Sequence, residues 1–172
     1  MNGKTLLKKF VLHNKCQLKV LFGDVLLSFK EILGAGKYTS VVLFYDPLIF
    51  KKNKRLIRFI KKIPVNVVWI PIVSNESNKS FEQCSDIISK LVKNNIDRRS
   101  LFVGLGGGVV GDFSGFIASV YMRGVAYASV PTTLLSMVDS SIGGKNGVNF
   151  KSSKNLLGQI RQPDFILIDV NF

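Results

Sequence analysis

The chain has 172 residues, of which 47% are hydrophobic and 20% are charged. This composition excludes an intrinsically disordered protein, and the length suits one domain with a buried core. The formal net charge of +13 suits anionic small ligands. A nucleic acid or a membrane surface is also attracted by such a charge and has to be considered as a partner.

The N-terminal segment lacks the pattern of a secretory signal. Lysines at positions 4, 8, 9 and 15 interrupt it, so no apolar stretch precedes a small-residue cleavage site. The longest uncharged stretch of the second half, residues 124–138, is too short to cross a bilayer and contains Pro131. We therefore expect a cytoplasmic protein without a membrane partner.

In the first half of the chain, short apolar runs alternate with helical patterns. Strands are predicted at residues 18–22, 41–45 and 65–72. Helices are predicted at residues 25–33 and 48–63, and from Ser77 or Asn78 to about Val92. Further strands are predicted at residues 101–105 and 125–130, with a helix from Val109 to about Met122 between them. This alternation predicts a Rossmann-like α/β domain, a largely parallel sheet with flanking helices and no internal domain boundary.

The predicted helix at residues 48–63 is basic and amphipathic. Such a helix could face a membrane or a nucleic acid. A solvated outer face on a helix that packs on the core is the more common origin of a charge run. Phe50 and Phe59 fall among the apolar positions rather than forming a stacking platform. We therefore expect neither partner.

Few side chains suit metal or redox chemistry. Cys16 and Cys84 are far apart in sequence and have no metal or redox spacing, which predicts free thiols in a reducing compartment. His13 is the only histidine, so neither a nucleophile–histidine pair nor a zinc-type site can be assembled. We expect no metal ligands in this chain.

The clearest sign of a ligand is a glycine-rich turn between a strand and a helix. Gly106, Gly108 and Gly111 satisfy the pattern G-x-G-x-x-G. Glycines let backbone N–H groups approach a phosphate, and the positive end of the following helix points to the same place. The motif alone is weak, because the usual ribose-binding acid about twenty residues further on is missing. Tight helix–strand packing would also explain it, but the third consecutive glycine and Asp112 favour a nucleotide.

Three strand ends are expected to converge. In parallel sheets, ligands collect outside the carboxyl ends of the strands. Asp46, the loop at residues 75–79 and the loop at residues 104–112 all follow predicted strands. We expect these three segments to meet.

Polar residues gather again after the last predicted strand. The hydroxyls of Thr132 and Thr133 either cap a helix or face a ligand. Residues 139–145 then combine an acid, two hydroxyls, a flexible turn and a lysine. This nearly uncharged region contains the cations Arg123, Lys145 and Lys154. They suggest an anion pocket, most simply one for phosphate.

Taken together, these segments resemble the N-terminal, NAD-binding part of 3-dehydroquinate synthase, a member of the sugar-phosphate cyclases. The ordered series that carries the resemblance is GGGVVGD at 106–112, GF at 115–116, RG at 123–124, PTTLL at 131–135, VDSS at 138–141, GGK at 143–145, KN at 154–155, QP at 162–163 and ID at 168–169.

The resemblance implies a lyase of the shikimate pathway, which leads to chorismate and the aromatic amino acids. Its substrate, a phosphorylated sugar acid, is 3-deoxy-arabino-heptulosonate 7-phosphate, and its products are 3-dehydroquinate and phosphate. NAD acts there as a catalyst, because the substrate hydroxyl that it oxidises is later restored.

The resemblance also assigns residues. Asp46, Glu76 and Lys79 fall at the adenosine end of NAD. The remaining cofactor contacts would come from Gly106, Gly107, Gly108, Val109, Val110, Gly111, Asp112, Thr132 and Thr133. Asp139 would bind a hydroxyl near the cofactor. The substrate's phosphate, carboxylate or hydroxyls would be bound by Arg123, Lys145, Lys154 and Asn155, with Lys145 and Lys154 expected to touch NAD as well.

Some positions depart from the family pattern. The family usually has Asp-Gly-Glu where this chain has Ser74-Asn75-Glu76, and threonine where it has Asn146. Gln159-Ile160-Arg161 replaces a typical Ala-Phe-Tyr. These changes affect affinity at the adenosine end and local packing more than the reaction class.

In that family the metal ligands, a glutamate and two histidines, lie in a helical C-terminal domain. The resemblance therefore implies that residues 1–172 form only the NAD-binding N-terminal domain. A divalent metal, zinc or cobalt, would come with the second domain, supplied on the same chain or as a separate half. The isolated chain is expected to be inactive, and a homodimer is implied.

Three other hypotheses stay open at this stage. A sister sugar-phosphate cyclase with another product would differ mostly in the second domain. A non-catalytic NAD-binding remnant is a second alternative, although the retained cations at 123, 145 and 154 argue against long decay. A nucleic-acid binder is supported by charge alone.

Overall fold

A computed structural model describes residues 6–11, 17–34 and 36–172. His13 and Cys16 lie outside these ranges. Within them the chain forms a seven-stranded sheet, in which only the edge pair β1–β2 is antiparallel. In spatial order the strands are β1 (Leu6–Val11), β2 (Gln17–Phe22), β9 (Phe165–Ile168), β6 (Ala126–Pro131), β5 (Leu101–Gly106), β3 (Ser40–Tyr45) and β4 (Asn66–Pro71).

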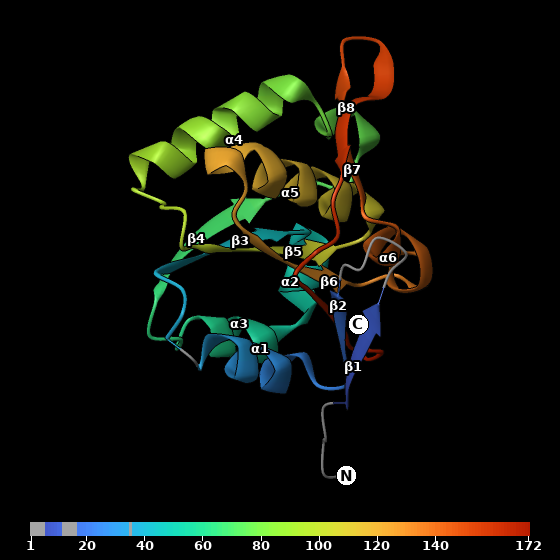
Figure 1. Ribbon diagram of the computed structural model, residues 1–172. Coiled ribbons are helices and arrows are strands. Elements are labelled where there is room, and N and C mark those ends of the chain that lie inside the picture. Colours follow the sequence, from blue (N-terminus) through green and yellow to red (C-terminus); the bar gives the residue numbers. More distant parts are fainter. Residues whose placement is uncertain (1–5, 12–16, 35) are drawn as a thin grey trace.

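Helices cover both faces of this sheet (Figure 1). One face carries α4 (Phe81–Lys93) and α5 (Gly108–Val120), and the other carries α1 (Val25–Leu33) and α3 (Lys54–Ile60). The predicted Rossmann-like α/β fold with a largely parallel sheet is confirmed. Every residue of β5 is buried, as expected for a central strand with helices on both sides.

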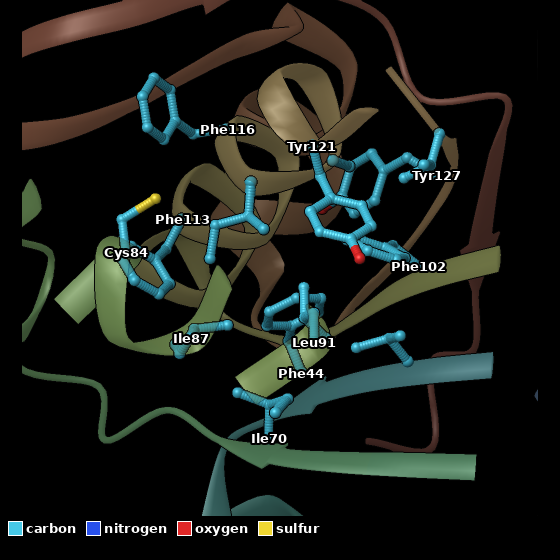
Figure 2. Close-up of a cluster of buried hydrophobic side chains, with 14 of the residues drawn as sticks. Phe44, Ile70, Cys84, Ile87, Leu91, Phe102, Phe113, Phe116, Tyr121 and Tyr127 are labelled. Atoms are coloured by element: carbon cyan, nitrogen blue, oxygen red, sulfur yellow. The ribbon is translucent and has the colours of Figure 1, made fainter. Parts of the chain in front are cut away.

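The larger core cluster lies between the sheet and the pair α4–α5 (Figure 2). Phe44 and Phe102 rise from the sheet, and Phe113 meets them from α5, all fully buried. Cys84 is a free buried thiol, as predicted, and burial raises its pKa to about 11. This core fixes α5, whose first turn follows the glycine-rich segment.

The predicted basic helix at residues 48–63 is wrong as a single element. It is divided into α2 (Pro47–Lys52) and α3, because Asn53 leaves the helical conformation at φ −104° and ψ 70°. The Asn53 side chain accepts a hydrogen bond from Leu56 N and so begins α3. The basic side chains lie on the exposed face while Leu56 and Ile60 are buried.

The helix predicted to begin at Ser77 or Asn78 begins later. Residues Glu76–Asn78 form a short 3-10 helix, η1, and α4 starts at Phe81. Ser80 caps α4 by accepting a hydrogen bond from Gln83 N at 3.2 Å. The loop that carries Glu76 and Lys79 is therefore separate from the helix.

Several elements had no prediction. The strands β1 and β9 extend the sheet, and two antiparallel strands, β7 (Lys145–Phe150) and β8 (Ser153–Ile160), form a separate hairpin. β8 is exposed along nearly its whole length and so has no apolar alternation to reveal it.

Three short helices were also not predicted. The π-helix η3 (Ser136–Ser140) and the short helix α6 (Ser141–Gly143) precede the hairpin, and the 3-10 helix η2 (Tyr121–Arg123) follows α5.

The hairpin packs on α5. A Cβ added at Gly115 would lie 2.0 Å from Asn146 Oδ1, so helix and hairpin touch where the helix has no side chain. The hairpin rises on the same side of the sheet as α4 and α5 (Figure 1). No helix in the described part of the chain is both long and apolar enough to span a lipid bilayer.

Replacing Phe113 by alanine should lower the free energy of unfolding by about 3–5 kcal/mol, because the ring is fully buried and its removal leaves a cavity. The matched control on the same helix is Val120→Ala, whose side chain is 44% exposed and whose loss should cost under about 1 kcal/mol. Urea unfolding of the three proteins checks this. Equal losses from both substitutions would contradict the described packing of α5.

Candidate functional site

The order of the strands makes the neighbouring pair β3 and β5 the switch point of the sheet. These two strands are neighbours, but the chain leaves them in opposite directions, from β3 outward to β4 and from β5 inward to β6. The helices that follow cover opposite faces of the sheet. Open α/β sheets bind ligands outside the carboxyl ends of strands at such a switch point. Asp46 and the glycine turn lie there, and Asp46 N donates a hydrogen bond to Leu105 O at 3.0 Å.

The glycine turn presents an uncapped helix N-terminus. Gly106 ends β5, Gly107 is the N-cap of α5, and no side chain caps this helix. The first backbone N–H groups of a helix lack intrahelical acceptors and attract anions. A Cβ at Gly111 would meet nothing within 4 Å, whereas one at Gly106 would lie 2.6 Å from Val110. Gly106 therefore serves packing as well, and the Val110 side chain is fully buried in the core.

A buried tyrosine supports the turn from below. Tyr127 OH donates to Gly111 O at 3.1 Å and lies 3.0 Å from Ser114 Oγ, which donates to Val110 O. A Cβ at Gly104 would lie 2.3 Å from Ser114 Oγ, so this contact needs a glycine in β5. Burial raises the pKa of Tyr127 to about 12, so the phenol stays protonated and can donate.

An ion pair joins the loop after β4 to the first turn of α5. Lys79 Nζ lies 2.6 Å from Asp112 Oδ2 and 3.9 Å from Glu76 Oε1. The Lys79 side chain is 3% exposed, so this charge is almost fully removed from water. Burial raises the pKa of the Asp112 carboxyl, and the Lys79 ammonium opposes that shift.

The predicted convergence of three strand ends is confirmed. Asp46 Oδ2 accepts a 2.5 Å hydrogen bond from Ser74 Oγ in the loop after β4, and its Oδ1 caps α2 at Leu48 N. The Lys79–Asp112 pair joins the same loop to the glycine turn. All three segments therefore meet at one edge of the sheet.

A pocket of about 480 Å³ opens between the hairpin and α5. It brings together Asp112, Lys145 and Asn155, three of the residues singled out in the sequence. Lys145 and Asn155 are exposed, and Lys154 is the exposed neighbour of Asn155 on β8. Lys145 thus brings a cationic side chain to a pocket that Asp112, the acid of the glycine turn, also lines.

A second, smaller pocket lies against the glycine turn itself. Its lining includes Gly106, Gly107 and Asp112, together with Ser140 and Ser141 from the segment after β6. Ser141 Oγ and Thr132 Oγ1 are buried and have no hydrogen-bond partner within the described ranges. Of these two residues Ser141 lines the pocket, and a buried hydroxyl without a partner there is explained if it bonds to a polar ligand.

The remaining candidates are spread around these pockets. Thr133 is exposed, and its methyl carbon would be 3.4 Å from a Cβ at Gly107. Asp139 is exposed on η3. Arg123 does not join the group, because it follows the far end of α5, about 20 Å from the glycine turn for a 13-residue helix.

No three His, Cys, Asp or Glu side chains in residues 6–11, 17–34 and 36–172 come close enough together to hold a metal ion.

A family model described as 3-dehydroquinate synthase N-terminal matches residues 69–172, more than half of the chain. The chain belongs to this family. A curated relative, the 3-dehydroquinate synthase of Dictyoglomus turgidum, is 46% identical over 134 residues, which is 78% of this chain and 36% of the relative.

Two solved structures of sugar-phosphate cyclases share the fold. A 2-deoxy-scyllo-inosose synthase complexed with carbaglucose-6-phosphate, NAD+ and Co2+ superposes with a TM-score of 0.86 at 24% identity, over 96% of this chain and 46% of that one. The 2-epi-5-epi-valiolone synthase of Streptomyces hygroscopicus, with NAD+ and Zn2+ bound, gives 0.77 at 27% identity, over 94% and 45%. The chain thus spans less than half the length of these proteins.

The residues that support the site were not predicted from the sequence. Tyr127 and Ser114 hold the glycine turn, Ser74 binds Asp46, and Asn149 links the hairpin to Glu76. Tyr127, Ser74 and Asn149 act through contacts with residues distant in sequence, which periodicity does not reveal. Ser114 bonds locally, to the carbonyl four residues before it, and also contacts Tyr127.

Breaking the buried ion pair from one side should cost more than removing it completely. Lys79→Met leaves the Asp112 carboxylate without its cation, and we expect a loss of about 3 kcal/mol in the free energy of unfolding. The double variant Lys79→Met/Asp112→Asn should lose less. Lys93→Met, an exposed lysine of α4, is the control. Urea unfolding measures the native protein and the three variants. A double variant less stable than Lys79→Met would refute an ion pair whose cation is removed from water.

Tyr127→Phe should change how stability depends on alkaline pH. The pKa of Tyr127 is about 12 in the folded state and 10.0 in the unfolded chain. The phenol's contribution to the free energy of unfolding is therefore complete below pH 10 and is lost as the pH rises toward 12. The native protein should lose roughly 2–3 kcal/mol across that window relative to the Phe variant. Below pH 9 the variant should be less stable by about 1 kcal/mol. Denaturant unfolding from pH 8 to 12 tests both, and a constant difference would refute burial of the hydroxyl.

Proposed function

We propose that this chain is the NAD-binding N-terminal domain of an enzyme that converts 3-deoxy-arabino-heptulosonate 7-phosphate to 3-dehydroquinate and phosphate. The observation that carries the proposal is the meeting of the uncapped glycine turn, Asp112 and the pocket lined by Lys145 and Asn155. One site there offers a phosphate-binding helix terminus beside cationic and amide groups. Membership of the 3-dehydroquinate synthase family supports the reaction.

The residues at the glycine turn fit NAD. The free N–H groups at the start of α5 suit a pyrophosphate, and the unpartnered Ser141 hydroxyl suits a polar ligand in the adjoining pocket. Thr132, the residue after β6, also has a buried hydroxyl without a partner in the described ranges. Thr133 lies beside Gly107. When bound, NAD+ would supply reversible hydride acceptance from a substrate hydroxyl. The turn at residues 106–112 would hold its central part, and Asp46, Glu76 and Lys79 its adenosine end.

The hairpin pocket suits a phosphorylated sugar acid. The Lys145 and Lys154 ammonium groups would bind the substrate's phosphate or carboxylate, and the Asn155 amide would bind an oxygen nearby. Asp139, exposed beside Ser140, would accept a hydrogen bond from a hydroxyl. These groups would orient the reacting carbon toward the glycine turn. Arg123 stays a proposed substrate ligand, although it is not among the residues that line this pocket.

We further propose that zinc or cobalt is held by a C-terminal domain, on this chain or on a separate one. The titles of the two cyclase structures name Co2+ and Zn2+. Leu134 and Leu135, beside the site, are 76% and 69% exposed, which supports an apolar surface that another domain covers. We also propose a homodimer and a cytoplasmic location, in line with the resemblance. Residues 1–172 alone should bind NAD+ without turnover.

The test combines binding with reconstitution. Calorimetry should detect NAD+ binding to the 172-residue chain, and that chain should release no phosphate from the substrate. Joined to the C-terminal part of the Dictyoglomus turgidum relative, the chain should release phosphate when Zn2+ or Co2+ is added. Lys145→Met in that assembly should lower turnover by about 100-fold, because a charge that stabilises the leaving phosphate is lost.

The control is Lys151→Met, an exposed lysine at the tip of the same hairpin, which should leave turnover within about twofold. Absence of NAD+ binding would overturn the cofactor assignment. Unchanged turnover in Lys145→Met would remove that residue from the site.

A further inference from the structure

Asn149 on β7 bonds to both ends of the proposed site. Its Nδ2 donates to Glu76 O at 3.0 Å and lies 3.3 Å from Glu76 Oε1, and its backbone N donates to Lys79 O at 2.7 Å. Its Oδ1 accepts a 2.8 Å hydrogen bond from Asn155 N. One half-buried side chain therefore joins the loop after β4 to the outer strand of the hairpin.

The hairpin is irregular where Asn149 reaches across it. Val148 pairs with Leu157 and Phe150 pairs with Ser153, so residues 154–156 form a bulge opposite Asn149 alone. Bulges redirect side chains and are common beside active sites. This one carries Lys154 and Asn155.

The bulge contains one residue with an uncommon backbone conformation. Asn155 has φ +50°, in the left-handed region that residues other than glycine seldom adopt and that asparagine adopts more readily than most. The bond from Asn155 N to Asn149 Oδ1 is a contact that holds it in place. The direction in which Lys154 and Asn155 point therefore depends on the position of the Asn149 amide.

We propose that Asn149 is a positioning residue that couples dinucleotide binding at Glu76 and Lys79 to the conformation of the bulge at residues 154–156. The side-chain amide of Asn149 is planar and rigid. A ligand that fixes Glu76 therefore fixes Asn149 Nδ2, which donates to Glu76, and with it Asn149 Oδ1, which accepts from Asn155 N. The site would then assemble its anion-binding groups when NAD+ is bound. By linkage, an anion on the bulge would tighten NAD+ binding by the same factor. This inference rests on the proposed function.

Two substitutions separate the coupling from simple support of the hairpin. Asn149→Asp keeps the oxygen that accepts from Asn155 N but replaces the donor facing Glu76 with a carboxylate oxygen, which repels it. Asn149→Ala removes both links. Asn66→Asp is the matched control, because Asn66 is exposed at the start of β4, away from the site.

The experiment measures amide hydrogen exchange of the full 172-residue chain with and without NAD+, together with NAD+ titration by calorimetry. In the native protein and in Asn66→Asp, NAD+ should slow exchange at residues 76–79 and at residues 153–156. In Asn149→Asp, the Asn155 amide should stay protected without NAD+, but NAD+ should no longer slow exchange in the bulge. The affinity for NAD+ should fall by about fivefold or more. Asn149→Ala should lose the protection in both states.

Three outcomes would overturn the coupling. If NAD+ protects residues 76–79 of the native chain but not 153–156, the coupling fails while the cofactor site stands. If Asn149→Asp responds to NAD+ as the native protein does, the amide is not the link. If the native chain binds no NAD+, the cofactor proposal fails and the coupling fails with it. Circular dichroism of each variant confirms that it is folded.

Discussion

The buried Lys79–Asp112 ion pair joins segments that the sheet alone would leave apart. Lys79 belongs to the loop after the edge strand β4, and Asp112 to the first turn of α5. A charge so far from water is stable only beside its partner, so each loop limits where the other can lie. The rest of the site depends on this contact. Asn149 ties the hairpin to the same loop, and Tyr127 fixes the turn from the core side.

The site is rigid on one side and open on the other. Its inner wall is built on β5, whose residues are all buried, on the half-buried first turn of α5, and on the buried phenol of Tyr127. Its outer wall is the hairpin, whose strand β8 is exposed along most of its length and bears Lys154 and Asn155. The dinucleotide of the proposed function would therefore meet a largely preformed surface, while the groups proposed for the anionic substrate lie on an element with few packing constraints.

The sequence predicted the elements whose apolar pattern is decisive and the strand ends where they meet. Residues 101–112 indicate a buried strand, a glycine turn and a helix, because each has its own composition and period. The hairpin was missed, since β8 buries neither face, and Asn53 divided a helix that its neighbours would have continued. Candidate ligands could be named by resemblance. Their supports, Ser74, Tyr127 and Asn149, could not, because each acts on a residue distant in sequence.

The solvated basic face of α2 and α3 affects the rate at which charged ligands reach the protein, whether or not a macromolecular partner binds to this face. It contributes to a net charge of +13, and the resulting positive field attracts anionic ligands as they diffuse toward the protein. At physiological ionic strength such a field is screened beyond about 8 Å, whereas the Lys79–Asp112 pair, whose lysine side chain is 3% exposed and whose aspartate side chain is 27% exposed, is screened much less. Added salt would thus slow the arrival of anions and leave the architecture that receives them unchanged.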